Sequence, residues 1–379
     1  MNDPLQSPLP KLSAAWLREV PKLQSQLLDW YTQKGRHHLP WKSNDPYAIW
    51  ISEIMLQQTQ VSTVIQKYNQ WMRLFPTIEV LASSNQEEVM KCWEGLGYYT
   101  RARNIYKAAQ ILVKNFQGKI PEGRLERLSL PGIGPSTASA IGAFAFGKSE
   151  AIFDGNVRRV WARWWGKQHP TLTQKIATQK KQKKQIEKHL TEKERIQIDW
   201  SIAQSATPLS SDQVKAWTQA IMDLGATICT QKKPKCQECP WQKTCKAHLQ
   251  HQEELYPLPK KKIVRQEESL KWAWITNEQG QIAICKPSSH GKWAGLWRLP
   301  ELDSKNIKIL NLLGKGKQNL THRQILWELY KSQSIQWMDP NWVWVNLEQW
   351  NEKAWPRFIR QWWDHYSDIE KNQLFLKNS

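Results

Sequence analysis

The sequence predicts a mainly α-helical protein that carries a smaller α+β domain at its C-terminal end. Residues 12–250 hold apolar side chains at helical spacing, as in the run from Ile51 to Tyr68. Residues 251–269 are a linker that contains prolines and lysines. Residues 270–379 change to short alternating runs that are typical of strands. We therefore expect two domains separated by this linker.

The charge of the chain predicts an anionic partner. Its 379 residues include 54 Lys and Arg against 34 Asp and Glu, which gives a net charge of +20. Nucleic acid and a membrane surface both fit this excess, whereas solubility alone explains it less well. No basic amphipathic anchor, membrane-spanning run or secretory signal stands out in the sequence. We therefore favour nucleic acid over a membrane and expect a cytoplasmic protein.

Prolines and glycines separate the predicted helices of the first domain. Examples are Pro76, Gly95 and Pro121. Residues 174–195 are dominated by Lys, Gln and Glu. Two interpretations remain for that segment: a solvated helix or mobile insertion, or an arm that contacts DNA.

The segment LSLPGIGPSTASAIGAF, residues 128–144, contains two closely spaced glycines, Gly132 and Gly134. It lacks the Gly-Lys-Ser/Thr step of a P-loop and the third glycine of a dinucleotide-binding loop. The flanking residues predict helix, tight turn and helix, with Pro135 at the first helical position. The glycines would let backbone N–H groups approach a phosphate at a helix N-terminus. An ordinary tight turn fits this segment equally well.

Four of the six cysteines lie within 17 residues. Their spacing is C-x6-C-x2-C-x5-C, and they are Cys229, Cys236, Cys239 and Cys245. In a chain without a secretory signal, such a group favours a metal site over disulfides. Four thiolates hold either zinc or a [4Fe–4S] cluster, and the spacing alone does not decide between them. Lys232 and Lys233 lie in the first loop, where they either face DNA phosphates or are simply solvated.

The C-terminal region follows a different pattern. Residues 271–286 predict two short strands about a turn at 277–280, and residues 342–350 predict another strand. Twelve of the 24 tryptophans lie after residue 269. Most of them should pack in the core of an α+β domain, and a few could stack on bases.

Several motifs occur together and in order. They are the hairpin LPGIGPSTA, the acid Asp154 that lies 20 residues after Gly134 in IFDGNVRRV, and the cysteine spacing. This combination resembles the endonuclease III superfamily of helix-hairpin-helix DNA glycosylases. SEIMLQQTQV, WEGLGYYTRARN and MDLGATIC further resemble its MutY family of adenine DNA glycosylases. The resemblance is dense over residues 23–248. It implies a two-lobed helix-hairpin-helix core, a [4Fe–4S] cluster rather than zinc, and a C-terminal Nudix-like (MutT-like) domain.

The resemblance also implies a function, that of a monofunctional adenine DNA glycosylase in base excision repair. Such an enzyme flips adenine out of the duplex and hydrolyses its N-glycosidic bond, which leaves an abasic site. The adenine is one mispaired with 8-oxoguanine or guanine, so that its removal prevents G:C to T:A mutation. The expected partner is double-stranded DNA with such a mismatch. The expected protein is a monomer that is cytoplasmic and associated with the nucleoid.

This chemistry requires an acid that protonates the base and a carboxylate that stabilises a cationic sugar. By resemblance, Glu53 is the acid, and apolar neighbours would help to keep it protonated. Asp154 is then the carboxylate, and Asn156 organises the sugar and water. As structural alternatives, Glu53 is a solvated helix position and Asp154 is a helix N-cap. Ser136 stands where a lyase of this superfamily places Lys, so we expect no strong lyase activity.

The resemblance further implies a set of DNA contacts. In the family, the Gln-Gln and Gly-Tyr-Tyr segments probe the base pair or fill the gap left by the flipped base. The expected DNA-binding residues here are Gln57, Gln58, Tyr98, Tyr99, Arg101, Gly132, Gly134, Lys232 and Lys233. Gln58 and Tyr98 are the first choices for the probing role. Core packing is the alternative for the tyrosines.

In the C-terminal domain, the family uses a Phe-Ser-His loop to contact 8-oxoguanine. The nearest match is Leu320-Thr321-His322, in which Thr321 and His322 keep the hydroxyl and the imidazole. An ordinary surface histidine is the alternative for His322. Residues 291–330 lack the acidic box that binds magnesium in a working Nudix enzyme, so we expect no pyrophosphohydrolase activity.

Three other functions fit part of the sequence. A bifunctional glycosylase and lyase of the endonuclease III type shares the hairpin, Asp154 and the cysteines, but requires Lys at Ser136. A non-catalytic DNA-binding protein is disfavoured because both Glu53 and Asp154 are present. A Nudix hydrolase fused to a DNA-binding domain lacks the acidic box.

Overall fold

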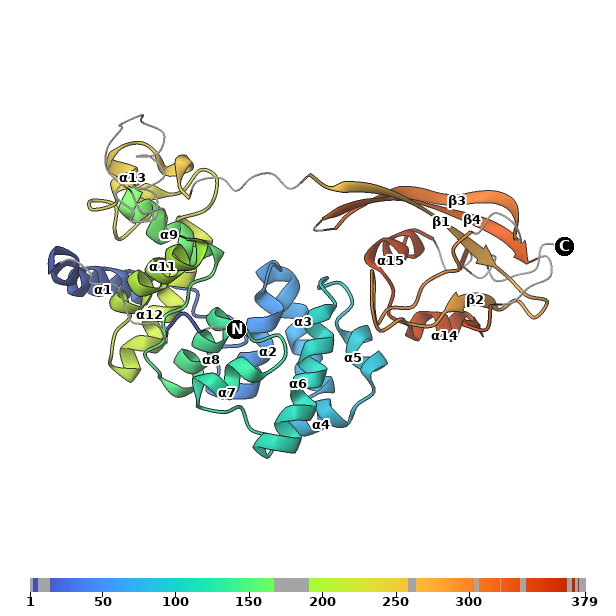
Figure 1. Cartoon of the computed structure of the whole chain (residues 1–379), viewed down its shortest axis with the longest axis horizontal. Helices are drawn as coiled ribbons and strands as arrows, with labels where there is room; N and C mark the ends of the chain where they lie inside the picture. Colours follow the sequence, from blue (N-terminus) through green and yellow to red (C-terminus); the bar gives the residue numbers. More distant parts are fainter. Residues whose placement is uncertain are drawn as a thin grey trace. The chain divides into compact units, whose positions relative to one another are not determined.

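A computed structural model of the chain divides into two compact units (Figure 1). The first contains Met1–Met72 and Ile111–Lys260, and the second contains Arg73–Gln110 and Lys261–Ser379. The structure describes residues 3–5, 14–166, 191–257, 264–302, 307–320, 322–334, 339–366, 370–371 and 374. Most of the Lys- and Gln-rich segment 174–195, part of the predicted linker and Thr321 therefore lie outside the described residues.

The first unit is built from helices. They are α1 (Ala14–Lys34), α2 (Pro46–Leu56), α3 (Val61–Leu74), α7 (Arg124–Ser129), α8 (Pro135–Phe146), α9 (Gly155–Trp165), α11 (Glu192–Ala206), α12 (Ser211–Asp223) and α13 (Lys246–Leu249). Short helical turns follow at η2 (Leu224–Ile228), η3 (Cys236–Glu238) and η4 (Glu253–Leu255). The described part of residues 14–257 contains no strand, which confirms the helical prediction. No helix of the described chain is both long and apolar enough to span a bilayer.

Helix α2 illustrates how the sequence builds this unit. Asp45 accepts a hydrogen bond from the Tyr47 N–H, and Pro46 occupies the first helical turn, so the helix starts here. Nearly all of its side chains are buried, because α8 packs against it. The helix ends at Leu56, because the backbone of the next residue, Gln57, is extended. The apolar run of the sequence is thus split into α2 and α3.

Tryptophans dominate the core beneath α9. Trp161 stacks on Trp241 with ring centroids 5.2 Å apart and an interplanar angle of 28°. Trp16 packs edge-on against Trp161 and Trp164. Buried aromatic pairs of this kind contribute about 0.5–1.5 kcal/mol each beyond the area that they bury. They join α1, α9 and the segment that carries the cysteines into one core.

The second unit combines helices with two small sheets. Its elements are α4 (Ile78–Ser83), α5 (Gln86–Cys92), most of α6 (Thr100–Phe116), β1 (Gln266–Ile275), β2 (Ile282–Cys285), β3 (Ile307–Asn319), β4 (Arg323–Ser334), β5 (Trp342–Val345), α14 (Leu347–Glu352) and α15 (Arg357–Trp363). One sheet has the order β1-β4-β3, in which β1 runs parallel and β3 antiparallel to β4. The other pairs β2 with β5 in antiparallel fashion.

The strands predicted around residues 277–280 are confirmed as β1 and β2. They do not pair as a hairpin, however, because each finds its main partner elsewhere and they share a single bridge at Thr276 and Ile282. The strand predicted over residues 342–350 is correct only as far as Val345. Asn346 then begins α14 with a capping box that includes Gln349.

The tryptophans of the C-terminal region mostly form its core, as predicted. Trp274, Trp350, Trp355 and Trp363 are fully buried or nearly so. Trp350 stacks on Trp355 with ring centroids 3.8 Å apart. The same cluster includes side chains from β1, α14 and α15, so it fixes the helices against the sheet.

Candidate active site and cysteine cluster

Glu53 lies on α2, between the buried residues Ser52 and Ile54. Its side chain lines a cavity of about 290 Å³. Other residues around this cavity include Tyr31, Trp41, Lys42, Phe144 and Gln219. The Glu53 carboxyl forms no hydrogen bond or ion pair within the described residues. Burial, and then the negative charge of Asp154, raise its pKa to about 8.

Asp154 lies immediately before α9 and is its N-cap. Its Oδ1 accepts a hydrogen bond of 2.8 Å from the Val157 N–H, so the structural alternative for this residue is present. Burial raises the pKa of the Asp154 carboxyl. The N–H groups of Val157 and Asn156 and the charge of Arg159 oppose that rise. Asp154 therefore has donors and a cation that favour its charged form, whereas Glu53 has neither among the described residues.

Asn156 is held next to this carboxylate by Arg159. The guanidinium of Arg159 donates to Asn156 Oδ1 at 2.8 Å, to the Gly225 carbonyl at 2.6 Å and to the Cys229 carbonyl at 2.7 Å. A Cβ atom on Gly225 would lie 2.8 Å from the Cβ of Asn156. Glycine at position 225 therefore lets η2 approach the start of α9 closely. Gly225 and Arg159 lie in the motifs MDLGATIC and IFDGNVRRV, but the sequence analysis gave neither residue a role.

Ser136 joins the hairpin to the segment before Asp154. Its Oγ accepts a hydrogen bond of 3.2 Å from the N–H of Phe153. The sequence identified Ser136 only as a residue that is not lysine. In the structure it also satisfies a backbone donor directly next to Asp154.

The hairpin itself runs from α7 through residues 130–134 into α8, as the sequence predicted. Gly132 has φ +82°, a left-handed conformation that favours glycine. Gly134 is the N-cap of α8 and has an extended backbone. A Cβ atom on Gly134 would meet nothing within 4 Å, so the protein's own packing does not require glycine there. The open side of this turn leaves room for a ligand at the N-terminus of α8.

The Gln-Gln segment shows two different environments. Gln57 is half-buried, and its Nε2 donates to Thr137 Oγ1 of α8 at 3.1 Å. Gln58 is exposed and has φ +57°. A left-handed backbone is rare for a residue other than glycine and often marks functional sites.

The Gly-Tyr-Tyr segment of the second unit shows the same division. Tyr98 is 52% exposed and has φ +48°. Tyr99 is half-buried, and its hydroxyl donates to the Trp355 carbonyl at 3.2 Å. Arg101 donates to the carbonyls of Leu96 and Gly97, and its guanidinium lies over the ring of Tyr98. Arg101 therefore supports the turn that presents Tyr98.

The cysteine thiols line one small apolar cavity in the first unit. They belong to Cys229, Cys236, Cys239 and Cys245. Among the described residues, no three of these sulfurs lie within 4.8 Å of one another. A single zinc ion, with bonds of about 2.3 Å, would draw its thiolates to roughly 4 Å apart.

The charged side chain of Arg163 borders the cysteine cavity. Arg163 is buried, and its guanidinium donates to Cys229 Sγ at 3.4 Å and to the carbonyls of Thr230 and Gln231. A guanidinium in this position suits a thiolate ligand. The loop that follows exposes Lys232 and Lys233.

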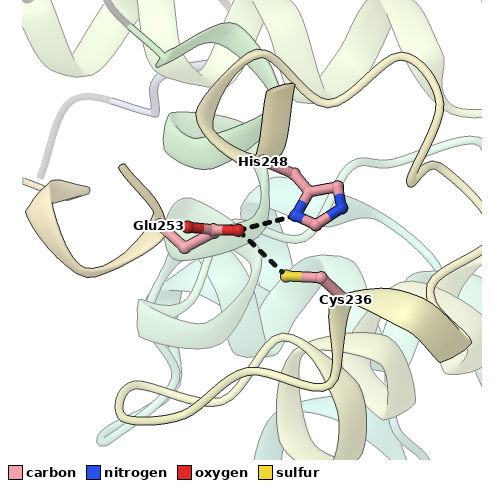
Figure 2. A group of neighbouring side chains, drawn as sticks. All are labelled: Cys236, His248 and Glu253. Atoms are coloured by element: carbon pink, nitrogen blue, oxygen red, sulfur yellow. Dashed lines mark hydrogen bonds and ion pairs between the residues drawn. The ribbon is translucent and has the colours of Figure 1, made fainter. Parts of the chain in front are cut away.

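His248 and Glu253 also line this cavity. Figure 2 shows the carboxylate of Glu253 directed toward His248 and Cys236. Glu253 Oε1 lies 2.6 Å from His248 Nδ1, and Cys236 Sγ donates to the same carboxylate oxygen at 3.6 Å. Burial, followed by the charge and the hydrogen bond of Glu253, raises the pKa of Cys236 to about 12. Burial raises the pKa of Cys239 to about 12 as well. Both thiols would ionise at neutral pH only with a cationic partner.

The loop that is predicted to contact 8-oxoguanine in the C-terminal region is only partly described. His322 is exposed, and its carbonyl accepts a hydrogen bond from the Gln266 N–H at the start of β1. Thr321 lies outside the described residues. The contact of this loop with 8-oxoguanine stays a prediction.

Comparison with known proteins agrees with this arrangement. Residues 51–193 match the model of the HhH-GPD superfamily of base excision DNA repair proteins. An adenine DNA glycosylase of Buchnera aphidicola (subspecies Baizongia pistaciae) is 36% identical over 340 residues, which cover 85% of this chain and 90% of the relative. Human adenine DNA glycosylase is 36% identical over 247 residues, which cover 62% of this chain and 41% of the human protein.

Among solved structures, a thermostable thymine-DNA glycosylase matches with a TM-score of 0.51 and 25% identity, over 62% of this chain and 98% of that chain. Fold and site together define a DNA glycosylase of base excision repair, with a helix-hairpin-helix core and a smaller C-terminal α/β region. Within that superfamily, the chain belongs to the adenine DNA glycosylase family. The family and the enzyme class that the motifs predicted are thereby confirmed.

Proposed function

We propose that the protein is a monofunctional glycosylase that removes adenine opposite 8-oxoguanine or guanine from double-stranded DNA, acting as a monomer. The observation that carries this proposal is the pair of carboxyl groups in the first unit. Glu53 faces a cavity and has a pKa of about 8, whereas the Asp154 carboxylate accepts a backbone hydrogen bond and lies near the Arg159 cation, which favour its charged form. Two carboxyl groups in such different surroundings can divide the roles of acid and anion.

In the proposed reaction, adenine first leaves the base stack and enters the cavity. Protonated Glu53 gives its proton to a ring nitrogen of adenine, and the N-glycosidic bond breaks with its electron pair on the base. Ionised Asp154 stabilises the cationic sugar that remains. Water, positioned with the help of Asn156, adds to the sugar carbon and returns a proton to Glu53. The products are free adenine and an abasic site.

The absence of a lyase step rests on Ser136. A lyase reaction needs an amine that forms a Schiff base with the sugar, and a hydroxyl cannot do this. The Ser136 hydroxyl is also engaged with the N–H of Phe153. We therefore assign it to positioning of the segment before Asp154.

The four cysteines fit a [4Fe–4S] cluster in their donor chemistry and their spread. Such a cluster would give the loop between Cys229 and Cys236 a fixed shape, with Lys232 and Lys233 exposed toward DNA phosphates. Together with the hairpin glycines, these lysines would hold the DNA backbone without reading its sequence. No step of the reaction passes through the cluster.

The domains and the remaining DNA contacts take the roles that the adenine DNA glycosylase family implies. Residues 12–250 form the catalytic domain in this proposal, and residues 251–269 form a linker. Residues 270–379 form a Nudix-like domain that contacts 8-oxoguanine through Thr321 and His322. Gln58 and Tyr98 probe the mismatch, which is supported by the exposure and left-handed backbone of both residues.

The direct test uses a duplex with one adenine opposite 8-oxoguanine, and a control duplex with adenine opposite thymine. After incubation, each sample is divided and one half is heated in alkali. We expect strand cleavage of the mismatched duplex mainly after alkali. No cleavage in either half would disprove the function, and equal cleavage in both halves would favour the lyase.

The metal assignment has its own measurement. The purified protein should contain about four irons and four sulfides per chain. Cys239→Ser should lower both contents together and weaken DNA binding. A content of one zinc per chain would contradict the cluster.

A further inference from the structure

Two stretches of the second unit that are far apart in the sequence meet around Glu94. The carboxylate Oε1 of Glu94 accepts hydrogen bonds from the Trp355 N–H at 3.2 Å and from Arg360 Nε at 3.0 Å. The hydroxyl of Tyr99 donates to the carbonyl of the same Trp355 at 3.2 Å. Both main-chain groups of Trp355 therefore bind the residues at the two ends of segment 94–99, which contains Gly97 and Tyr98.

The partners from the C-terminal region are rigidly placed. Trp355 is fully buried and stacks on Trp350, which packs in turn against Trp274. Arg360 also donates to the Lys353 carbonyl at 3.1 Å. The side chains of Glu94 and Arg360 are only 13% and 17% exposed, so water competes little for their ion pair.

The segment between the two anchored residues has an unusual backbone. Gly95, Gly97 and Tyr98 all have positive φ, at +96°, +69° and +48°. For Tyr98 this conformation costs of order 1–3 kcal/mol and persists only where the surroundings fix it. The anchors at Glu94 and Tyr99 fix the two ends of the turn from which the exposed Tyr98 projects.

We propose that Trp355 and Arg360 are positioning residues for Tyr98, so that the C-terminal region holds the probing tyrosine in its DNA-binding conformation. This inference rests on the proposed role of Tyr98 in binding mismatched DNA. It gives the C-terminal region a second task besides contact with 8-oxoguanine. We call the contacts of Glu94 and Tyr99 with Trp355 and Arg360 the brace. The brace fixes the turn that carries Tyr98 and does not contact the base opposite adenine. Loss of the brace should therefore impair adenine removal opposite guanine and opposite 8-oxoguanine by similar factors.

The variant Arg360→Ala tests the brace, and Arg357→Ala is its matched control. Arg357 lies on the same helix, is exposed, and makes none of the hydrogen bonds to Glu94 or Tyr99 that the described residues show. We expect Arg360→Ala to weaken the binding of both mismatched duplexes about tenfold, the effect of losing one charge-assisted hydrogen bond. Arg357→Ala should stay within about twofold of wild type.

A second readout needs no DNA. Hydrogen–deuterium exchange of the amides of residues 95–100 should be faster in Arg360→Ala than in wild type and unchanged in Arg357→Ala. Tyr99→Phe removes only the hydroxyl bonded to Trp355 and should act in the same direction with a smaller effect. Arg360→Lys should restore part of the loss. Far-ultraviolet circular dichroism and Tm would show that each variant is folded.

The outcomes separate the two proposals. If exchange at residues 95–100 is unchanged in both Arg360→Ala and Tyr99→Phe, the brace does not exist. If exchange rises but neither duplex is bound more weakly, or only the 8-oxoguanine duplex is affected, the positioning role is wrong. If wild type fails to release adenine at all, the proposed function fails, whereas the exchange arm still decides whether the brace is present.

Discussion

The interior of α2 and the start of α9 each supply one carboxyl group to the candidate site, and the surroundings of the two groups differ. Glu53 lies within α2, where the backbone N–H groups are used by the helix itself. Asp154 lies at the N-terminus of α9, where the first N–H groups are free to donate to it. Burial raises the pKa of both groups, but only Asp154 has hydrogen bonds and a cation that oppose the rise.

The difference teaches that position in a helix separates an acid from an anion. The buried Glu53 carboxyl has no hydrogen-bond or ion-pair partner among the described residues, so its protonated form is favoured. A helix N-terminus offers donors and a favourable dipole, so the group ionises readily. The same functional group, a carboxyl, can thus act as an acid or as an anion, depending on its surroundings.

The largest expected effect comes from Glu53→Gln, which removes the acid and keeps the shape of the side chain. Single-turnover release of adenine should fall by about 10²–10⁴-fold, because general acid catalysis contributes roughly that much. Binding of the mismatched duplex should stay within about threefold of wild type. Full activity of the variant would show that Glu53 is not the acid.

The same variant should also be more stable than wild type. Below pH 4.5 the Glu53 carboxyl is protonated in the folded and the unfolded state alike. As the pH rises from 4.5 toward 8, it ionises in the unfolded state first, so the free energy of unfolding falls. Glutamine does not ionise, so at pH 8 the variant Glu53→Gln avoids this loss. Its free energy of unfolding should be roughly 1–3 kcal/mol higher than that of wild type. Urea unfolding at pH 5 and pH 8 measures it, and an equal gain at both values would contradict the pKa.

At the start of α9, the variants Asp154→Asn and Asp154→Ala distinguish the catalytic role of Asp154 from its role as helix N-cap. Both should slow adenine release by about 10²–10³-fold, because the sugar cation loses its counter-charge. Asn caps a helix as well as Asp does, so Asp154→Asn should keep its Tm, whereas Asp154→Ala should lose about 1 kcal/mol of stability. Equal destabilisation in both variants would mean that the carboxylate charge, and not the cap, holds the start of α9.

The pH dependence of the rate tests both regions together. Adenine release needs Glu53 protonated, so the rate should fall about tenfold per pH unit above the Glu53 pKa of about 8. Toward acid pH, the rate should fall once Asp154 is protonated. DNA binding measured over the same range shows whether the alkaline limb belongs to chemistry. An alkaline limb that begins near pH 5 would place the acid elsewhere.

Much of the first region was predictable, because its signals are local. Asp154 precedes a helical pattern, as an N-cap does, and the glycines of the hairpin lie between two helical runs. The spacing of the cysteines likewise shows that they share one site. The apolar neighbours of Glu53 in α2 predicted that its pKa is raised, whereas the added effect of the Asp154 charge comes from the tertiary fold.

The contacts that join distant segments were not predictable. β1 and β2 follow one another around a turn, yet each pairs mainly with a strand that comes later in the chain. Sequence alternation identifies a strand but does not choose its partner. The bond from Tyr99 to Trp355 joins residues more than 250 positions apart, and neither side chain signals the other. Such contacts are set by tertiary packing.

The smallest expected effect is that of Ser136→Ala, which removes the acceptor for the Phe153 N–H next to Asp154. An unpaired backbone donor costs about 1–3 kcal/mol when water cannot reach it, and less where it can. We expect a loss of about 1 kcal/mol in stability and a rate a few-fold lower, with DNA affinity unchanged. Ser136→Thr keeps the hydroxyl and is the control. If Ser136→Ala matches wild type in rate and Tm, the hydrogen bond does not position Asp154. The position of the Asp154 carboxyl group would then be fixed by α9 alone.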